Sequence, residues 1–344
     1  MLKEMKIAVL RQSRRMGLTA RVARSAWRRR RLLVLCYHGI SLDDEHQWDP
    51  DLYMSPERFR ERLDLLRAGG YEVLALADAV PLLLEGRLPA KAVSITFDDG
   101  MHDFYARAYP ILREFRYPAT LYLTTYYCHD QRPVFDLVCS YILWKGLRRE
   151  LDGAEFLGEP GILRLGSRAE CSAVFGRIYR RVREAGLSAD AKDELARRLA
   201  ARLEVDYERI RSLRIVHLMT PQEVRAVAAG GVDVQMHTHR HRTPRDRTEF
   251  VREIRENRTA IAAMTGSGAG VEHFCYPSGD YDLRFLPWLR EEGVKTATTC
   301  HAGFAGSLSE PLLLPRVLDC SGLSSVEFEG WLSGVSSFLP RRRR

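Results

Sequence analysis

Long apolar runs are missing from this chain of 344 residues. No stretch approaches the roughly 18 consecutive apolar residues that a membrane-spanning helix needs. The basic N-terminus is not followed by the apolar segment of a secretory signal peptide, so we expect a cytoplasmic location. Hydrophobic residues make up 45% and charged residues 28% of the chain, a composition that fits one large globular α/β domain or two smaller ones.

Paired cysteines are also lacking. The seven cysteines are odd in number, widely spaced and never arranged as Cys-x-x-Cys. This pattern argues against both a disulfide framework and a structural zinc site built from cysteines. We expect reduced, packed thiols.

Acidic residues are scarce at the two ends of the chain. Residues 1–31 hold eleven Lys or Arg against one acid, Glu4, which gives a net charge of +10, and residues 341–344 are four arginines. Because the whole chain carries +8, residues 32–340 carry −6. A mildly acidic body without a recognisable nucleic-acid motif argues against nucleic-acid binding.

The basic leader, residues 1–31, also has an apolar pattern. Apolar residues recur at three- and four-residue spacing between its arginines: Leu2, Met5, Val9, Leu18, Val22 and Ala26. This is typical of a basic amphipathic helix that lies on an anionic membrane. A terminal helix that is simply exposed to solvent is the alternative.

Strand-like and helical segments alternate through most of the chain. Residues 55–70 predict a helix, with Ser55 as N-cap, Pro at the first helical position and Gly at the end, and apolar strands are predicted before and after it. This alternation favours a parallel sheet with crossover helices, and over this length a (β/α) barrel. Residues 128–215 are charged and helical instead, which predicts an insertion or lid on the barrel.

The first cluster of chemical groups ends a predicted strand. The segment VSITFDDG, residues 93–100, places Asp98 and Asp99 side by side at the end of an apolar run. Adjacent carboxylates repel and are costly to desolvate, so either a positive group lies there or the strand has reached solvent. On an extended strand end, the two side chains point in different directions.

The second cluster ends another predicted strand, VDVQMHTHRH, residues 232–241. If the chain turns helical after the strand, His237 and His241 face one side and can share a metal ion, while His239 points away. Two imidazoles and one carboxylate suit a divalent metal with open positions for water and substrate, and the second carboxylate is then free to act as a base. Both clusters lie at the C-terminal ends of strands, where barrels gather catalytic groups.

Three segments together resemble the motifs of one protein family. In order, TFDDG (96–100), HTHRH (237–241) and FCYPSGDY (274–281) resemble the motifs of the polysaccharide deacetylase family, also called carbohydrate esterase family 4 or the NodB-homology domain. The resemblance covers roughly residues 32–320, interrupted by the insertion. It implies a distorted (β/α) barrel that hydrolyses N-acetyl groups from N-acetylhexosamine residues with zinc or a similar divalent metal.

The resemblance also implies roles for single residues. Asp98 corresponds to the general base, and three residues correspond to metal ligands: Asp99, His237 and His241. Thr238 would support a ligand or bind substrate, and Tyr276 and Pro277 of the third motif would line the substrate site.

Two departures from the family pattern matter. Where many members carry an arginine that orients the base, this chain has Cys275, as in the exopolysaccharide subgroup with a FAYP-like third motif. Arg316 in LLLPRVLD is the candidate replacement; the alternative is that Arg316 is an ordinary surface arginine.

The second departure is the late Leu-x-His motif that supplies a general acid, which is absent after residue 301. His38 in LCYHGI is the candidate acid, because a histidine titrates near pH 7 and this one ends the first barrel strand. The alternative is that His38 only hydrogen-bonds the backbone at the strand end. His301 is the alternative acid.

These expectations combine into one function. We expect a metal-dependent N-deacetylase that acts on a cell-surface glycan or on its lipid-linked precursor at the inner face of the membrane, where the leader would hold it. An esterase or amidase on another acylated glycan is one alternative. A catalytically inactive barrel that binds glycan is the other.

Overall fold

The fold is that of a computed structural model, which describes residues 2–268 and 270–340. The strands of the main sheet are β1 (Arg31–Tyr37), β4 (Glu72–Val73), β5 (Ala92–Phe97), β6 (Thr120–Leu123), β9 (Asp233–Met236), β10 (His273–Cys275), β11 (Thr296–Thr298), β12 (Ala305–Gly306) and β13 (Val317–Leu318). In space the order is β11-β10-β9-β6-β5-β1-β12, with β13 also beside β1 and β4 beside β5. All these described pairs are parallel except β1 with β12.

The sheet curls because one segment links its two sides. Leu314 forms a parallel bridge with Thr298 at the end of β11, and three residues later Val317 pairs with Leu35 of β1. Residues 314–318 therefore span from one side of the curled sheet to the other, at the edge where the strands end. The predicted α/β fold of the distorted-barrel type is confirmed.

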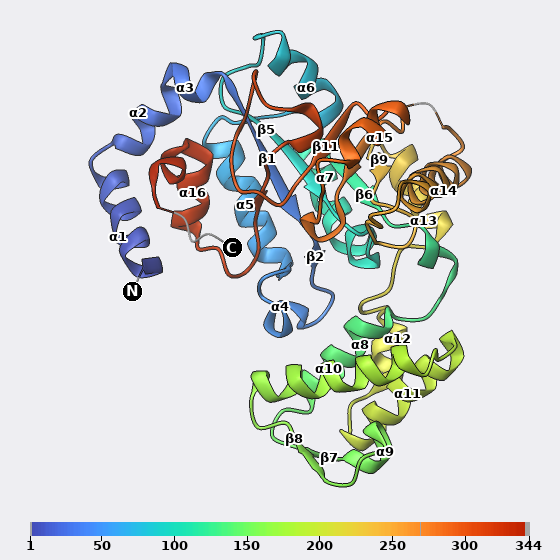
Figure 1. The fold of residues 1–344 in the computed structure, drawn as a ribbon. Coiled ribbons are helices and arrows are strands. Elements are labelled where there is room, and N and C mark those ends of the chain that lie inside the picture. The colour runs from blue at the N-terminus through green and yellow to red at the C-terminus, as the bar shows by residue number, and fades with distance from the viewer. Residues whose placement is uncertain (1, 269, 341–344) are drawn as a thin grey trace.

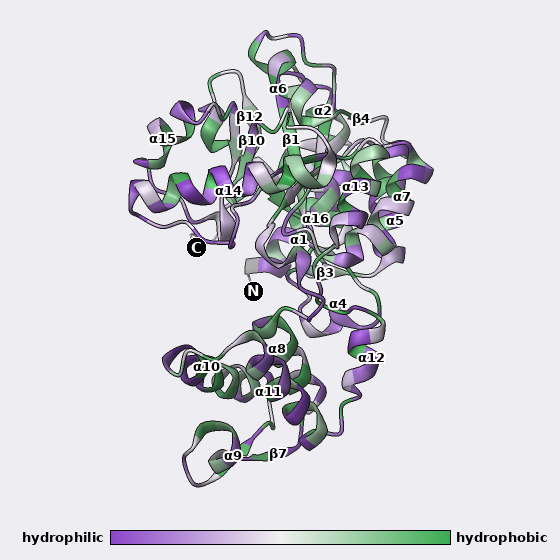
Figure 2. Cartoon of the chain, turned by 90° about the vertical axis from the view of Figure 1, so that its right-hand side faces the viewer, coloured by the Kyte–Doolittle hydropathy of each residue, from purple (hydrophilic) through white to green (hydrophobic). Residues whose placement is uncertain are grey.

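Helices cover the outside of this sheet (Figure 1). They are α5 (Pro56–Ala68), α7 (Tyr109–Phe115), α13 (Pro221–Ala229), α14 (Arg247–Thr265), α15 (Phe285–Glu291) and α16 (Ser325–Ser333). A π-helical segment, Phe104–Ala108, leads into α7, and short 3-10 turns occur at Tyr126–His129, Pro277–Gly279, Pro311–Leu313 and Val335–Phe338. Figure 2 shows hydrophobic strands inside and hydrophilic segments on outer helices such as α14, as expected for helices that bury one face.

One helix closes the end of the barrel at which the strands begin. Helix α6 (Leu76–Leu84) packs its buried leucines and Val80 against Leu32 and Val34 of β1. In Figure 1 it lies beyond the start of β1, on the side opposite the helical lobe. The other end of the barrel, where the strands stop, is therefore the one available for a site.

A helical lobe lies on that side (Figure 1). It contains α8 (Phe135–Lys145), α9 (Gly153–Leu157), α10 (Arg168–Glu184), α11 (Ala189–Arg202), α12 (Tyr207–Ser212) and the hairpin of β7 (Glu150–Asp152) with β8 (Ile162–Arg164). The loop after β1 reaches it: β2 (Gly39–Ile40) pairs with β3 (Tyr53–Met54), and α4 (Glu45–Trp48) lies between them. Arg168 donates to the Trp48 carbonyl at 2.6 Å, and Arg209 contacts Asp43 at 3.1 Å.

The basic leader forms three helices rather than one. They are α1 (Leu2–Arg15), α2 (Leu18–Arg24) and α3 (Ala26–Arg29), and Gly17 breaks the first two apart with a φ of 71°. The leader packs against α16, with Leu10 buried and Arg14 bonded to Glu329 at 2.9 Å. The basic tail, residues 341–344, lies outside the described residues.

Several local predictions are confirmed. The Ser55 side chain accepts a hydrogen bond from the amide of Arg58 and so caps α5. Each of the seven cysteines is a free thiol, and all are buried except Cys300, which is exposed. Within residues 2–268 and 270–340, no helix has both the length and the apolar composition needed to cross a bilayer.

Candidate active site

The first aspartate after β5 is held by an arginine. Asp98 is only 2% exposed, and Arg316 donates to both of its oxygens at 2.7 Å. The same guanidinium donates to Thr96 Oγ1 at 3.1 Å and to the Thr299 carbonyl at 3.2 Å, so its orientation is fixed. Arg316 sits in the segment that links the two sides of the sheet, and the structure brings this predicted partner onto Asp98.

Two thiols complete the surroundings of Asp98. Cys36 and Cys275 each place Sγ near Asp98 Oδ2, at 3.5 and 3.4 Å. Burial raises the pKa of both thiols, so each keeps its proton and acts as a weak donor. Burial also raises the pKa of Asp98, but the charge and hydrogen bonds of Arg316 outweigh it, and this pKa lies well below its usual range.

The second aspartate is separated from the first by a sharp turn. We expected an extended strand end, but Asp99 has a φ of 72° and Gly100 follows at 84°. Strand β5 ends at Phe97, and the left-handed conformation of Asp99 turns its side chain toward β9. A non-glycine residue in this conformation is strained, and such strain often marks functional sites.

Three predicted metal ligands meet at this turn. Asp99 Oδ1 lies 3.2 Å from Nε2 of His237 and 3.2 Å from Nε2 of His241. Ligand atoms around a tetrahedral zinc, each about 2.1 Å from the metal, are separated by about 3.4 Å, so these spacings suit one shared cation. Burial raises the pKa of Asp99, but the two imidazoles outweigh it and hold that pKa well below its usual range.

The protonation of His237 tests whether a cation fits. Its Nδ1 lies 2.9 Å from the Cys275 carbonyl, which can only accept, so Nδ1 carries the proton and Nε2 presents a lone pair. Asp99 Oδ1 is buried and has no hydrogen-bond partner among the described residues. Two lone pairs therefore face each other, and a divalent cation satisfies both, with His241 as a third ligand.

The loop after β9 differs from the predicted helical turn. His237 and His241 converge because the loop has left-handed residues at Thr238, with a φ of 62°, and at His241, with a φ of 54°. Helix α14 holds this loop from outside. Asn257 Oδ1 accepts from the amide of His237 at 3.0 Å, and Glu253 accepts from the amide of Arg240 at 2.8 Å.

The candidate acid lies beside the base. Nε2 of His38 is 3.8 Å from Asp98 Oδ2, and the side chain is 18% exposed. Its Nδ1 is buried without a hydrogen-bond partner among the described residues. The structure thus places His38 on the face where we expected it, between Asp98 and solvent. His301, the alternative, is exposed and stacks edge-on against Tyr281.

Two of the three residues predicted for the substrate site have fully buried side chains. Thr238 Oγ1 accepts from the amide of Arg242, so Thr238 supports the ligand loop, which is one of the two roles expected for it. Tyr276 donates to the Leu312 carbonyl at 3.0 Å. Pro277 does line a cavity of about 400 Å³, together with the ligand His241.

Sequence reasoning missed the residues that hold these groups. Thr96 had a detectable signal, since it precedes Asp98 by two positions and so shares its face of the strand. Asn257 had another: it interrupts the apolar face of α14 formed by Phe250, Ile254 and Ile261, where a buried amide needs partners. Cys36 had no detectable signal in the sequence beyond its place on β1.

Comparison with known proteins shows which family this chain resembles. The sequence model of "Polysaccharide deacetylase" matches residues 85–156 and 179–297. A stretch of 99 residues is 32% identical to the poly-beta-1,6-N-acetyl-D-glucosamine N-deacetylase of Escherichia coli (strain K12). That stretch covers 28% of this chain and only 14% of the relative.

Solved structures agree on the fold. The Streptococcus pyogenes deacetylase PplD matches with a TM-score of 0.56 and 18% identity, covering 90% of this chain and 99% of that one. IcaB from Ammonifex degensii matches with a TM-score of 0.54 and 18% identity, covering 88% and 97%. The curled sheet, the motif order and the family match over more than half of the chain lead to one conclusion: the chain belongs to the polysaccharide deacetylase family.

Proposed function

We propose that this protein is a metal-dependent N-deacetylase, with Zn²⁺ as the metal, that removes acetyl groups from N-acetylhexosamine units of a cell-surface polysaccharide or of its lipid-linked precursor. One observation carries this: a carboxylate and two imidazoles meet at the strand ends directly beside an aspartate fixed by arginine. The name of the E. coli relative, a deacetylase of poly-beta-1,6-N-acetyl-D-glucosamine, supports the substrate class.

The residues divide the work of hydrolysis. Asp99, His237 and His241 hold the metal, which when bound polarises the acetamide carbonyl and lowers the pKa of water. Asp98 takes the proton of the attacking water, and Arg316 fixes the plane of its carboxylate. Asn257 accepts from the amide of His237 and the Cys275 carbonyl accepts from its Nδ1, so both fix the orientation of His237.

His38 delivers the proton that the departing amine needs. It lies 3.8 Å from Asp98 and is more exposed than that aspartate, so a substrate entering from solvent meets His38 on its way to the base. Histidine is the side chain best suited to proton transfer near neutral pH, so it fits the role of general acid. His38 therefore replaces the late histidine that this chain lacks.

The test is acetate release from N-acetylglucosamine oligomers by the zinc-loaded protein, with Asp98→Asn as the inactive control. We expect acetate from wild type and a loss of about 10³-fold or more in Asp98→Asn. O-acetylated xylan in a parallel assay tests the esterase alternative. One equivalent of bound metal with no acetate from any substrate would support the inactive glycan-binding barrel and contradict the proposal.

We also propose that the leader contacts an anionic membrane at the cytoplasmic face. The side of α1 that packs on the body is marked by Leu10 and Ser13, and Arg28 anchors α3. Met5, Val9, Met16 and Leu18 are exposed beside basic residues such as Arg11, Arg15 and Arg21. An apolar and basic surface of this kind suits anionic headgroups.

Because Arg28 is buried in the body, point substitutions test this better than deletion of the leader. We expect Arg11→Glu/Arg15→Glu to sediment less with phosphatidylglycerol vesicles than wild type. The matched control is Arg180→Glu/Arg183→Glu on α10, two exposed arginines far along the chain from the leader. Equal sedimentation of both double variants would contradict membrane contact by the leader.

A further inference from the structure

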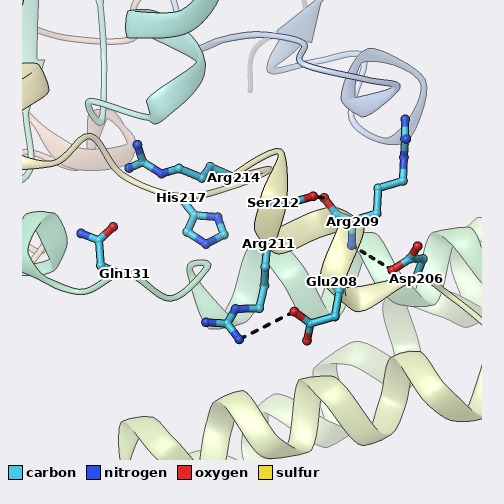
Figure 3. A pocket seen from close by; sticks show the side chains of 8 residues that line it. All are labelled: Gln131, Asp206, Glu208, Arg209, Arg211, Ser212, Arg214 and His217. Carbon is cyan, nitrogen blue, oxygen red and sulfur yellow. Dashed lines mark hydrogen bonds and ion pairs between the residues drawn. The ribbon is translucent and has the colours of Figure 1, made fainter.

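One cavity lies beside helix α12 and the segment that leads from the helical lobe back to the sheet, and none of the candidate metal ligands lines it. Its volume is about 700 Å³. Figure 3 shows its lining, which comes from α12, from the segment that returns to the sheet and from Gln131. The imidazole of His217 lies between Gln131, Arg211 and Arg214 in this view.

His217 brings a hydrogen-bond acceptor to this cavity. It is 2% exposed, and its Nδ1 lies 2.9 Å from the Ile215 carbonyl, so Nδ1 carries the proton. Burial lowers the pKa of His217 to about 4, which keeps the ring neutral. Within the described residues no hydrogen bond engages Nε2, so its lone pair is left for a ligand that enters the cavity.

Arg211 and Gln131 extend the cavity toward aromatic rings. Both also line a neighbouring cavity of about 640 Å³, together with Tyr126 and Tyr127. These tyrosines are 51% and 40% exposed, and their rings meet edge to face at 4.9 Å. Arg211 is only weakly engaged, with Glu208 at 4.0 Å, so its guanidinium can donate to a ligand.

The two cavities adjoin the candidate active site. The Tyr126 amide donates to the His239 carbonyl at 2.8 Å, within the loop that carries the metal ligands. On the other side, the His102 amide donates to the His217 carbonyl at 2.7 Å, and the Met219 amide donates to the Gly100 carbonyl at 3.0 Å. The loop after β9 and the turn after β5 are therefore each bonded directly to a segment that lines one of the two cavities.

The lining favours a neutral sugar over an anion. Two of the three arginines in the lining, Arg209 and Arg214, are paired with Asp43 and Glu223. Asp206 and Glu208 offset the charge of the third, Arg211, so the lining offers a phosphate or carboxylate little net attraction. A pyranose offers hydroxyls that donate to His217 Nε2 and accept from Arg211 and Gln131, and its C–H face packs on exposed aromatic rings.

We propose that these two cavities bind further sugar units of the substrate chain, so that the helical lobe makes this protein selective for polymers over single sugars. This inference rests on the proposed function, because the chain it describes is the one whose acetyl group reaches the metal.

The test compares N-acetylglucosamine oligomers of two and of six units by calorimetric binding to the zinc-loaded protein. We expect wild type to bind the longer oligomer about tenfold more tightly, and Gln131→Ala/Arg211→Ala to lose most of that gain. Tyr127→Ala, in the neighbouring cavity, gives an independent variant. Arg183→Ala, an exposed arginine of the same lobe outside both cavities, is the control that keeps the gain.

Four outcomes separate this inference from the proposed function. Equal affinity of wild type for both oligomers overturns the inference, as does an unchanged affinity ratio in both the double variant and Tyr127→Ala. Acetate release without any length dependence overturns the inference but leaves the deacetylase proposal standing. A length-dependent affinity without acetate release supports sugar binding by the lobe and overturns the deacetylase proposal.

Discussion

Arg316 meets Asp98 with two parallel hydrogen bonds in a site closed to solvent. A lysine keeps the positive charge but offers a point donor instead of a planar fork, so it cannot hold both oxygens. We expect Arg316→Lys to lower kcat/KM by about a hundredfold, because the base is then misplaced while the charge balance is kept.

The control is Arg284→Lys, at an arginine that also bonds both oxygens of an aspartate, Asp282, but on the surface. Kinetics on one oligomer measure both variants, and thermal melting checks that both fold. Wild-type kcat/KM in Arg316→Lys would show that the fork does not position the base.

His217 makes stability depend on pH through its burial. Its pKa is about 4 in the folded protein and about 6.5 when unfolded, so between these values the unfolded chain binds more protons. Stability then rises with pH in this window, and up to about 3 kcal/mol is lost as the pH falls from 6.5 to 4.

His217→Gln keeps a donor for the Ile215 carbonyl but cannot titrate. We expect the free energy of unfolding, measured in urea at pH 7, 6 and 5, to fall less steeply with acid in this variant than in wild type. His239 and His273, whose pKa values burial also lowers, remain in both proteins and cancel in the difference. If the free energy of unfolding depended on pH equally in the two proteins, His217 would not be the group responsible.

At the scale of elements, α14 carries the support for the metal loop. Asn257 accepts from the amide of His237 and donates to the Leu123 carbonyl and to Thr125 Oγ1. We expect Asn257→Leu to weaken zinc affinity about 10- to 100-fold, because supporting residues orient ligands. Competition with a coloured chelator measures the affinity, and Thr259→Ala, on the exposed face of the same helix, should match wild type.

The elements also show which features of the fold could be predicted from the sequence. The strand ends and the Ser55 cap were predictable because they depend on neighbours in sequence and on hydrophobic pattern. The conformation of the loop after β9 was not, because Glu253 and Asn257 hold it from a helix that begins six residues after His241. The helical turn we expected would use local hydrogen bonds, and these distant partners replace them.

The same limit applies to the residues predicted for the substrate site. Motif position placed Thr238 and Tyr276 near the site, and they are near it. Their burial depends on which way each side chain points, which follows from contacts such as Tyr276 with Leu312. Arg316 was predictable only through the resemblance, since it lies 218 residues from Asp98.

At the scale of the whole molecule, Arg28 joins the leader to the body. Its buried guanidinium donates to three carbonyls, those of Leu332, Arg31 and Ala92, and lies 4.9 Å from the Phe304 ring. We expect Arg28→Met to destabilise the protein by about 3 kcal/mol, because three buried acceptors lose their donor. Urea unfolding measures this, with the exposed Arg29→Met as the matched control; equal loss in both would mean that the leader is only loosely attached.

The segment of residues 314–318 has a consequence for biosynthesis. It supplies Arg316 and joins β11 to β1, yet it is among the last parts of the described chain to leave the ribosome. Until then Asp98 has no counter-charge, and closing the sheet requires contacts across most of the sequence, which form slowly. Pairing of Asp98 and completion of the barrel are thus one event, so a ribosome-bound chain that stops short of Arg316 carries Asp99, His237 and His241 but leaves Asp98 without its arginine.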